Sequence, residues 1–333
     1  MRIKLLIASD DADYTDHLSG YISEHHADII EVSVCSVPER LKELLKAQDF
    51  DAALLEAPLI VGLDLSPISL PMLLWTDGGN AAAETAELTK INKYQRISSI
   101  AAGVLEHCAK QSPDTCGPNS ARARITAVWS PAGGVGKTSV ALALSAKMAS
   151  ERKNAMYLNL EHFSSLPTYF TETGKSISAV FEMLENSECN IRMLIKGLCR
   201  HDNGGISYLC RPENYDDINI LSGENVTVLV SACAGISDEL IIDLPNVCDE
   251  RTRRIFALAD KVLLVIDQTP TARLKLSQFA SQHNVFELIK DKAALVENKS
   301  SATGEQLTDA VLSLPLIQSA DPQTIYKTLS RYF

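Results

Sequence analysis

A short glycine-rich segment carries the clearest chemical signal in this sequence. Residues 130–139 read Ser-Pro-Ala-Gly-Gly-Val-Gly-Lys-Thr-Ser, and they join an apolar stretch, 125–129, to an alanine-rich stretch, 140–150. Glycines let backbone N–H groups turn inward and approach phosphate oxygens, because no Cβ stands in the way. A lysine and a hydroxyl residue directly after such a turn suit a terminal phosphate and a magnesium ion. The segment therefore predicts a phosphate-binding loop between a strand and a helix.

Roles within this loop follow from position. The residues expected to bind the cofactor are Gly133, Gly134, Val135, Gly136, Lys137, Thr138 and Ser139. Lys137 is also expected to act in catalysis, and the Thr138 hydroxyl to bind Mg²⁺. The general pattern has a glycine six residues before the lysine, where this chain has Pro131. The alternative is a glycine-rich strand–helix turn in which the Lys-Thr pair stands by chance.

A phosphate loop needs a second carboxylate at the end of a neighbouring strand, where it steadies magnesium through water. Residues 240–245 read Leu-Ile-Ile-Asp-Leu-Pro, an apolar run that ends in Asp243. We predict that Asp243 is a catalytic and metal-binding residue. The alternative is an ordinary aspartate that caps a turn.

The elements that must position these residues alternate between strand and helix patterns. Strand patterns occur at 3–8, 29–34, 51–55, 72–75, 125–129, 155–160, 206–209, 240–243, 261–267 and 293–297, with helical spacing at 14–25, 38–47, 97–108 and 140–150. This alternation is typical of parallel sheets covered by helices. We predict an α/β protein of two domains, residues 1–110 and 123–333, joined by a linker at 111–122 that is rich in Pro, Gly, Ser and Asn.

Composition narrows the functional classes. The chain has 333 residues and a net charge of −11, and residues 1–112 hold 9 Lys and Arg against 17 Asp and Glu. A basic footprint for nucleic acid is therefore missing, and we expect no specific nucleic-acid partner. The eight cysteines form no Cys-x-x-Cys pair, and the N-terminal apolar run is too short for a signal peptide. We expect a cytoplasmic protein with reduced thiols.

Several motifs together resemble a known family. The loop, the Leu-Asn-Leu-Glu run at 158–161 and the Ile-Asp-Leu-Pro run at 242–245 are similar to motifs of the deviant-Walker class of MinD and ParA ATPases. Within that class, the order of domains most resembles the TadZ/CpaE proteins of Tad (Flp) pilus assembly. The resemblance implies bound ATP and Mg²⁺, a homodimer, and pilus or secretion machinery as partners. It also implies a location at a cell pole, or at a membrane through those partners.

Three positions depart from the family pattern. The class usually has a signature lysine where this chain has Ala132, and Asp-x-Asp where this chain has Asn159 and Glu161. Asn159 and Glu161 are kept as candidate catalytic residues, although an amide cannot act as a base. Because phosphoryl transfer depends on positioning and charge stabilisation, we expect nucleotide binding with weak or absent hydrolysis. The alternatives are an actively cycling ATPase on a membrane or nucleoid, and a signalling protein.

Two further features follow from the resemblance. Asn298 ends a strand pattern and is a candidate for reading the adenine, or is simply a turn asparagine. The C-terminal stretch 324–333 has an apolar stripe that would either bind a membrane or pack on its own domain.

Residues 1–108 resemble a response-regulator receiver domain. The matching positions are Asp10, Asp11, Glu56, Thr76 and Lys93, with Glu56 at the place of the phosphoacceptor aspartate. Glutamate moves the carboxylate by one methylene, so ordinary aspartyl phosphorylation is not expected. Two interpretations stay open: a constant negative charge that imitates phosphorylation, and a degenerate domain that serves for docking.

Overall fold

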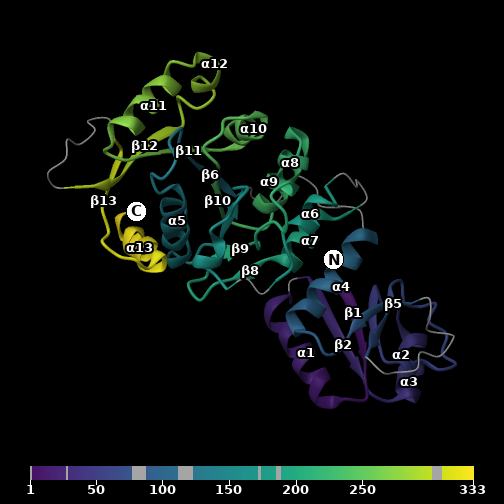
Figure 1. Ribbon diagram of the computed structural model, residues 1–333. Coiled ribbons are helices and arrows are strands. Elements are labelled where there is room, and N and C mark those ends of the chain that lie inside the picture. Colours follow the sequence, from purple (N-terminus) through teal and green to yellow (C-terminus); the bar gives the residue numbers. More distant parts are fainter. Residues whose placement is uncertain are drawn as a thin grey trace. The chain divides into compact units, whose positions relative to one another are not determined.

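The structure, a computed structural model, describes residues 2–27, 29–76, 88–111, 123–171, 174–184, 189–301 and 310–333. The chain divides into two compact units, Met1–Pro113 and Asp114–Phe333, and each unit has its own sheet (Figure 1). Apart from Gln111, which ends a helix, the linker expected at 111–122 lies outside the described residues.

The N-terminal unit is built on a five-stranded sheet with parallel pairing throughout. In spatial order its strands are β2 (Ile30–Cys35), β1 (Ile3–Ala8), β3 (Ala52–Leu55), β4 (Pro71–Trp75) and β5 (Thr89–Asn92). This 2-1-3-4-5 order is the flavodoxin-like order of doubly wound sheets. The sequence pattern predicts four of these strands and misses β5, since Ile91 is its one buried apolar residue.

Helices α1 (Ala12–His25), α2 (Pro38–Ala47) and α3 (Ala57–Ile60) lie between consecutive strands, and α4 (Ile97–Gln111) follows β5. The α1 helix begins where the Asp11 side chain accepts a hydrogen bond from the Tyr14 N–H at 3.1 Å, which satisfies a free donor of the first turn. Leu5, Leu6 and Ile7 of β1 are fully buried, as a strand covered on both faces requires.

The C-terminal unit is built on an eight-stranded sheet. Its spatial order is β13 (Leu312–Pro315), β12 (Ala293–Ser300), β11 (Lys261–Ile266), β6 (Arg124–Trp129), β10 (Glu239–Asp243), β7 (Ala155–Asn159), β9 (Ser207–Tyr208) and β8 (Arg200–His201). All neighbours are parallel except the β8–β9 pair. The prediction of a mostly parallel α/β protein is therefore confirmed.

Helices cover both faces of this larger sheet (Figure 1). They are α5 (Lys137–Ser150), α6 (Ser178–Phe181), α7 (Ile191–Leu198), α8 (Asp217–Ile220), α9 (Gly223–Ala234), α10 (Glu250–Leu258), α11 (Pro270–Ala280), α12 (His283–Phe286) and α13 (Pro322–Leu329), with 3₁₀ turns η2 (Leu166–Thr168) and η3 (Ser330–Tyr332). Val140 and Leu142 of α5 are fully buried in a core with Val265 and Val296 of the sheet.

The strand register brings three chain segments to one edge of the sheet. Strand β10 lies between β6 and β7, with Asp243 paired to Val128 on one side and to Asn159 on the other. Because the three strands run parallel, their carboxyl ends share one edge. Parallel α/β sheets bind ligands at this edge.

The C-terminal helix packs on its own unit. Helix α13 lies against α5, and Tyr326 and Leu329 are each 1% exposed in the core that also contains Leu142 (Figure 1). Packing buries Leu329 of the expected stripe and partly covers Ile325 and Phe333, while Tyr332 is 48% exposed. Among the described residues, no helix combines the length and apolar character that crossing a membrane requires.

Candidate functional site

The glycine-rich segment forms a tight loop between β6 and α5. Gly134 and Gly136 have φ angles of 75° and 88°, a backbone region that residues with a Cβ rarely adopt. At Gly136 there is also no room, since an added Cβ would stand 2.4 Å from the Asn298 Nδ2. At the start of the loop, the Ser130 Oγ accepts a hydrogen bond from the Ala132 N–H at 3.0 Å. Glycine is therefore required at both positions for its conformation, and at Gly136 for space as well.

Lys137 is the first residue of α5, so its ammonium group adds to the positive end of the helix dipole. The residue is 8% exposed, and its Nζ lies 4.0 Å from the Glu161 Oε1. That separation makes a loose ion pair, so the lysine is positioned but not fully engaged. A buried lysine at a helix N-terminus beside inward-turning amides is a site for an anion.

Two residues from β12 hold the loop. Asn298 is buried and donates from Nδ2 to the Val135 carbonyl oxygen at 2.8 Å. Lys299 donates from Nζ to the Gly134 carbonyl oxygen at 2.6 Å, with its own backbone at φ 57°. The structure thus gives Asn298 a contact with the loop, while its predicted contact with adenine stays a prediction. Lys299 was not singled out from the sequence, because its contact partner is 165 residues away.

Asp243 is fully buried at the end of β10. Its Oδ2 accepts from the Tyr157 hydroxyl at 2.9 Å and from the Asn159 Nδ2 at 3.3 Å. Its Oδ1 is buried and has no hydrogen-bond partner among the described residues, whereas most buried polar atoms in proteins have one. One carboxylate oxygen is therefore free for a group that the protein itself does not supply.

The environment of Asp243 raises its pKa to about 7. Burial is the main cause, because it disfavours the charged form, and the nearby Glu161 charge adds to it. The Thr138 and Tyr157 side chains, together with the Lys137 charge, act in the opposite direction. A cation at this position would favour the ionised carboxylate.

Tyr157 joins the site through its buried hydroxyl, which also accepts from the Asn159 Nδ2 at 3.0 Å. Burial, followed by the Asp243 charge, raises the pKa of Tyr157 well above its usual value, so it stays a neutral donor. No motif identifies this residue. The one available signal was its position two residues before Asn159, which puts both side chains on the same face of β7.

Asn159 and Glu161 stand beside Asp243 and Lys137 at the same sheet edge. The Asn159 Oδ1 accepts from the Glu161 N–H at 3.1 Å. Since its Nδ2 donates to Tyr157 and Asp243, the Asn159 amide links these two side chains to the backbone of Glu161. Burial raises the pKa of Glu161, while the Lys137 charge and a bond with Asn159 lower it. Ala132 is 5% exposed and packs in the core, so position 132 offers no charge to the site.

The site therefore gathers the predicted residues 133–139, Asn159, Glu161, Asp243 and Asn298 at one edge. Three features of this edge bear on a nucleotide with magnesium: two glycines in left-handed conformations, a buried lysine, and a carboxylate oxygen without a partner among the described residues. All three suit a triphosphate whose metal is steadied by Thr138 and Asp243.

The N-terminal unit contains a second polar cluster. The Lys93 Nζ lies 2.7 Å from the Glu56 Oε1 and 3.1 Å from the Asp11 Oδ2, and Lys93 and Glu56 are 6% and 8% exposed. The Asp10 N–H donates to the Glu56 Oε2 at 3.2 Å, and Thr76 directly follows β4. The carboxyl end of β3 thus carries a glutamate already neutralised by a lysine.

No family model matches the chain, and no curated protein matches it. A ParA family ATPase from Chlorobium tepidum TLS matches with a TM-score of 0.55 and 16% identity, over 64% of this chain and 96% of its own. The matched 64% of the chain is longer than the N-terminal unit, which ends at residue 113, so the match includes the larger unit. The larger unit has the fold of a ParA-family ATPase.

Two weaker structural matches are a putative plasmid partition protein from Borrelia burgdorferi B31 bound to AMPPNP and the septum site-determining protein MinD complexed with Mg-ADP from Pyrococcus horikoshii OT3. The first has a TM-score of 0.48 and 13% identity, over 62% of this chain and 90% of its own. The second has a TM-score of 0.48 and 12% identity, over 62% of this chain and 94% of its own.

Proposed function

We propose that this protein binds ATP·Mg²⁺ in its larger unit and that the bound nucleotide orders a homodimer, which positions assembly machinery in the cell. The observation that carries the proposal is the meeting of the loop, Lys137 and the unpartnered Asp243 oxygen at one edge of a ParA-type sheet. A glycine-rich loop alone, or a buried aspartate at a strand end alone, has an ordinary structural explanation. Their meeting is what phosphate and metal binding require.

Different residues of the site would bind the phosphates, hold the metal and fix the shape of the loop. Backbone N–H groups of the loop and the Lys137 ammonium bind the phosphate oxygens. The Thr138 hydroxyl and Asp243 hold the metal, whose charge offsets that of the phosphates when it is bound. Asn298 and Lys299 keep the loop in its glycine-dependent shape through the Val135 and Gly134 carbonyls.

Weak or absent hydrolysis is the second part of the proposal. Position 132 carries alanine, so no charge reaches the transferred phosphate from there. Asn159 donates its amide to Tyr157 and Asp243, which supports a structural role for it. Loss of one positioned group that stabilises a transition state costs about 10²–10³ in rate.

The cellular task is proposed as the positioning of Tad (Flp) pilus or related secretion machinery. It rests on the resemblance of the whole chain to TadZ/CpaE proteins, with the N-terminal unit as a receiver-like docking module. The Glu56–Lys93 pair supports a module that needs no phosphorylation, because the acceptor carboxylate is already held by a cation.

A pair of exposed aromatic rings supports the homodimer. Phe163 follows Glu161 by two residues, is 82% exposed, and stacks on the half-exposed Tyr215 at 5.7 Å between ring centroids. Exposed stacked aromatics beside a binding site are typical of interfaces.

Nucleotide-dependent sedimentation tests this function. With Mg²⁺ and a non-hydrolysable ATP analogue, we expect wild-type protein to bind the nucleotide and sediment as a dimer. We expect Lys137→Ala to lose binding, and Phe163→Ser to bind the nucleotide while remaining monomeric. Calorimetry in magnesium buffer that shows no heat with ATP would reject the proposal.

One observation favours a second candidate, an actively cycling ATPase. Glu161 places a carboxylate near Lys137, and its raised pKa is a property of groups that exchange protons. Steady-state phosphate release separates the two: strong stimulation by lipid vesicles or DNA would favour the cycling enzyme.

A further inference from the structure

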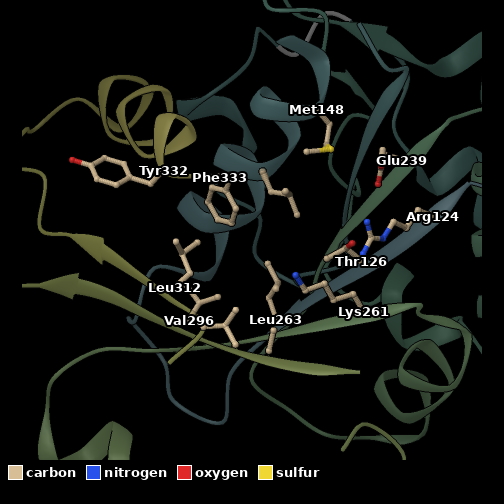
Figure 2. Close-up of a pocket in the computed structure, with 13 residues that line it drawn as sticks. Arg124, Thr126, Met148, Glu239, Lys261, Leu263, Val296, Leu312, Tyr332 and Phe333 are labelled. Atoms are coloured by element: carbon tan, nitrogen blue, oxygen red, sulfur yellow. The ribbon is translucent and has the colours of Figure 1, made fainter. Parts of the chain in front are cut away.

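A cavity of about 310 Å³ lies in the larger unit, away from the phosphate loop (Figure 2). Arg124, Glu239 and Lys261 line it, and they are the first residues of β6, β10 and β11. The loop, by contrast, follows the last residue of β6. Because these strands are parallel, the cavity lies at the amino edge of the sheet and the nucleotide site at the carboxyl edge.

The body of the cavity is apolar. Met148 of α5 lies on one side, Val296 and Leu312 of the sheet lie on another, and the Phe333 ring faces the space between them (Figure 2). Leu144 of α5 also lines the cavity. A cavity of this volume is at the lower end of the range for small-molecule sites and suits a ligand of about ten non-hydrogen atoms. Its size and lining are those of a site for a small apolar molecule.

Polar side chains gather on one side of the cavity, as Figure 2 shows. The strand register explains this grouping, because Glu239 pairs with Arg124 and Lys261 pairs with Thr126 across neighbouring strands. Arg124 and Thr126 are two residues apart on β6, so their side chains share a face of the sheet.

The charges on that side do not cancel. The Glu239 Oε1 lies 2.9 Å from the Lys153 Nζ, so its negative charge is neutralised from outside the cavity. Among the residues that the structure describes, Arg124 and Lys261 have no ion-pair partner. The exposed Arg124, the half-buried Lys261 and the buried Thr126 therefore lie at one end of an apolar cavity, where the Glu239 carboxylate is already paired.

We propose that this cavity binds a small amphipathic anion: an aliphatic chain of about eight carbons that ends in a carboxylate. The chain would lie between Met148, Leu312 and Phe333, and the carboxylate would accept hydrogen bonds from Lys261 and Arg124. Charge complementarity selects this occupant, since an uncharged chain leaves the half-buried Lys261 unpaired and a cationic one is repelled.

Calorimetry with octanoate tests the proposal, with EDTA and no nucleotide present so that failure at the phosphate loop has no influence. We expect octanoate to bind the full chain with a Kd of about 0.1–1 mM, from its ten non-hydrogen atoms. Octanol, with the same chain and no charge, should bind at least about tenfold more weakly, and octylammonium should not bind.

Three variants locate the site. Lys261→Gln should weaken octanoate binding about tenfold and leave octanol unchanged, because only the charge-assisted bond is removed. Leu312→Trp, on the half-buried edge strand, should weaken both ligands by filling the cavity. Lys275→Gln, the same change at an exposed lysine of α11, is the matched control and should bind like wild type.

Several results would overturn the proposal. These are no octanoate binding at 10 mM, equal affinity for octanoate and octanol, or unchanged affinity in Lys261→Gln. Thermal unfolding of each variant at the wild-type temperature confirms that it is folded.

Discussion

Asp243 offers the sharpest test of the site, because a group that binds a ligand should weaken the empty protein. We expect Asp243→Asn to abolish ATP·Mg²⁺ binding and to stabilise the nucleotide-free protein at pH 8. The pKa of this carboxyl is about 7 in the folded protein against an ordinary value of 3.8. Each unit of pKa corresponds to about 1.4 kcal/mol, so ionising Asp243 in the native state costs on the order of 4 kcal/mol.

The sign of the pH dependence follows directly. Between pH 3.8 and about 7 the folded state holds a proton on Asp243 that the unfolded chain has released, so this group destabilises the fold as pH rises through that range. Asparagine keeps an acceptor for Tyr157 and carries no charge. Its advantage should reach about 2–4 kcal/mol above pH 7 and fade towards pH 4.

Thermal melts in EDTA between pH 4 and pH 8 measure this effect. A gain of 2–4 kcal/mol raises Tm by roughly 5–15 °C in a domain of this size. Trp129 is buried in the larger unit and Trp75 belongs to the smaller one, so a Trp75→Phe background lets fluorescence follow the larger unit.

Asp249→Asn is the matched control for these melts. Burial acts to raise the pKa of Asp249, but the Thr252 N–H and the Arg251 guanidinium outweigh it and hold this pKa below its usual value. The stabilisation from Asp249 is therefore present above pH 3.8 and lost in acid. Asp249→Asn should lower Tm at pH 8, opposite in sign to Asp243→Asn. Equal melting of wild type and Asp243→Asn at pH 8 would refute the reasoning.

Three further predictions concern neighbouring features. Gly136→Ala should lower the free energy of unfolding by about 2 kcal/mol, because of the left-handed backbone and the clash with Asn298, and Asn298→Ala in the same chain should recover about 1 kcal/mol. A double-mutant cycle by urea unfolding measures this coupling, and strict additivity of the two changes would contradict the contact. Asn159→Asp should raise ATP hydrolysis at least about tenfold, measured as phosphate release, and an unchanged rate would show that this amide does not limit hydrolysis. Acetyl phosphate should leave the mass of the protein unchanged, because Glu56 is held by Lys93; an added phosphoryl group on Glu56 would show an accessible acceptor.

Strands with a strong apolar run were predictable, and weak ones were not. β1, β6 and β11 are buried over most of their length and stand out in the sequence. β5 and β13 lie at sheet edges, with burial patterns that show one buried residue each, and local pattern does not distinguish them from loops. Their pairing is decided by the strands next to them.

The sequence by itself determined the phosphate loop and the candidate metal carboxylate, because both signals are local: a glycine spacing next to Lys137 and an apolar run ending in Asp243. Only the tertiary structure decided what surrounds them. The donors Tyr157 and Lys299 reach the site across 86 and 165 residues of chain, and the raised pKa of Asp243 comes from burial, which no local pattern records. The cavity at the amino edge has the same origin, since strand register assembles it from residues that carry no motif.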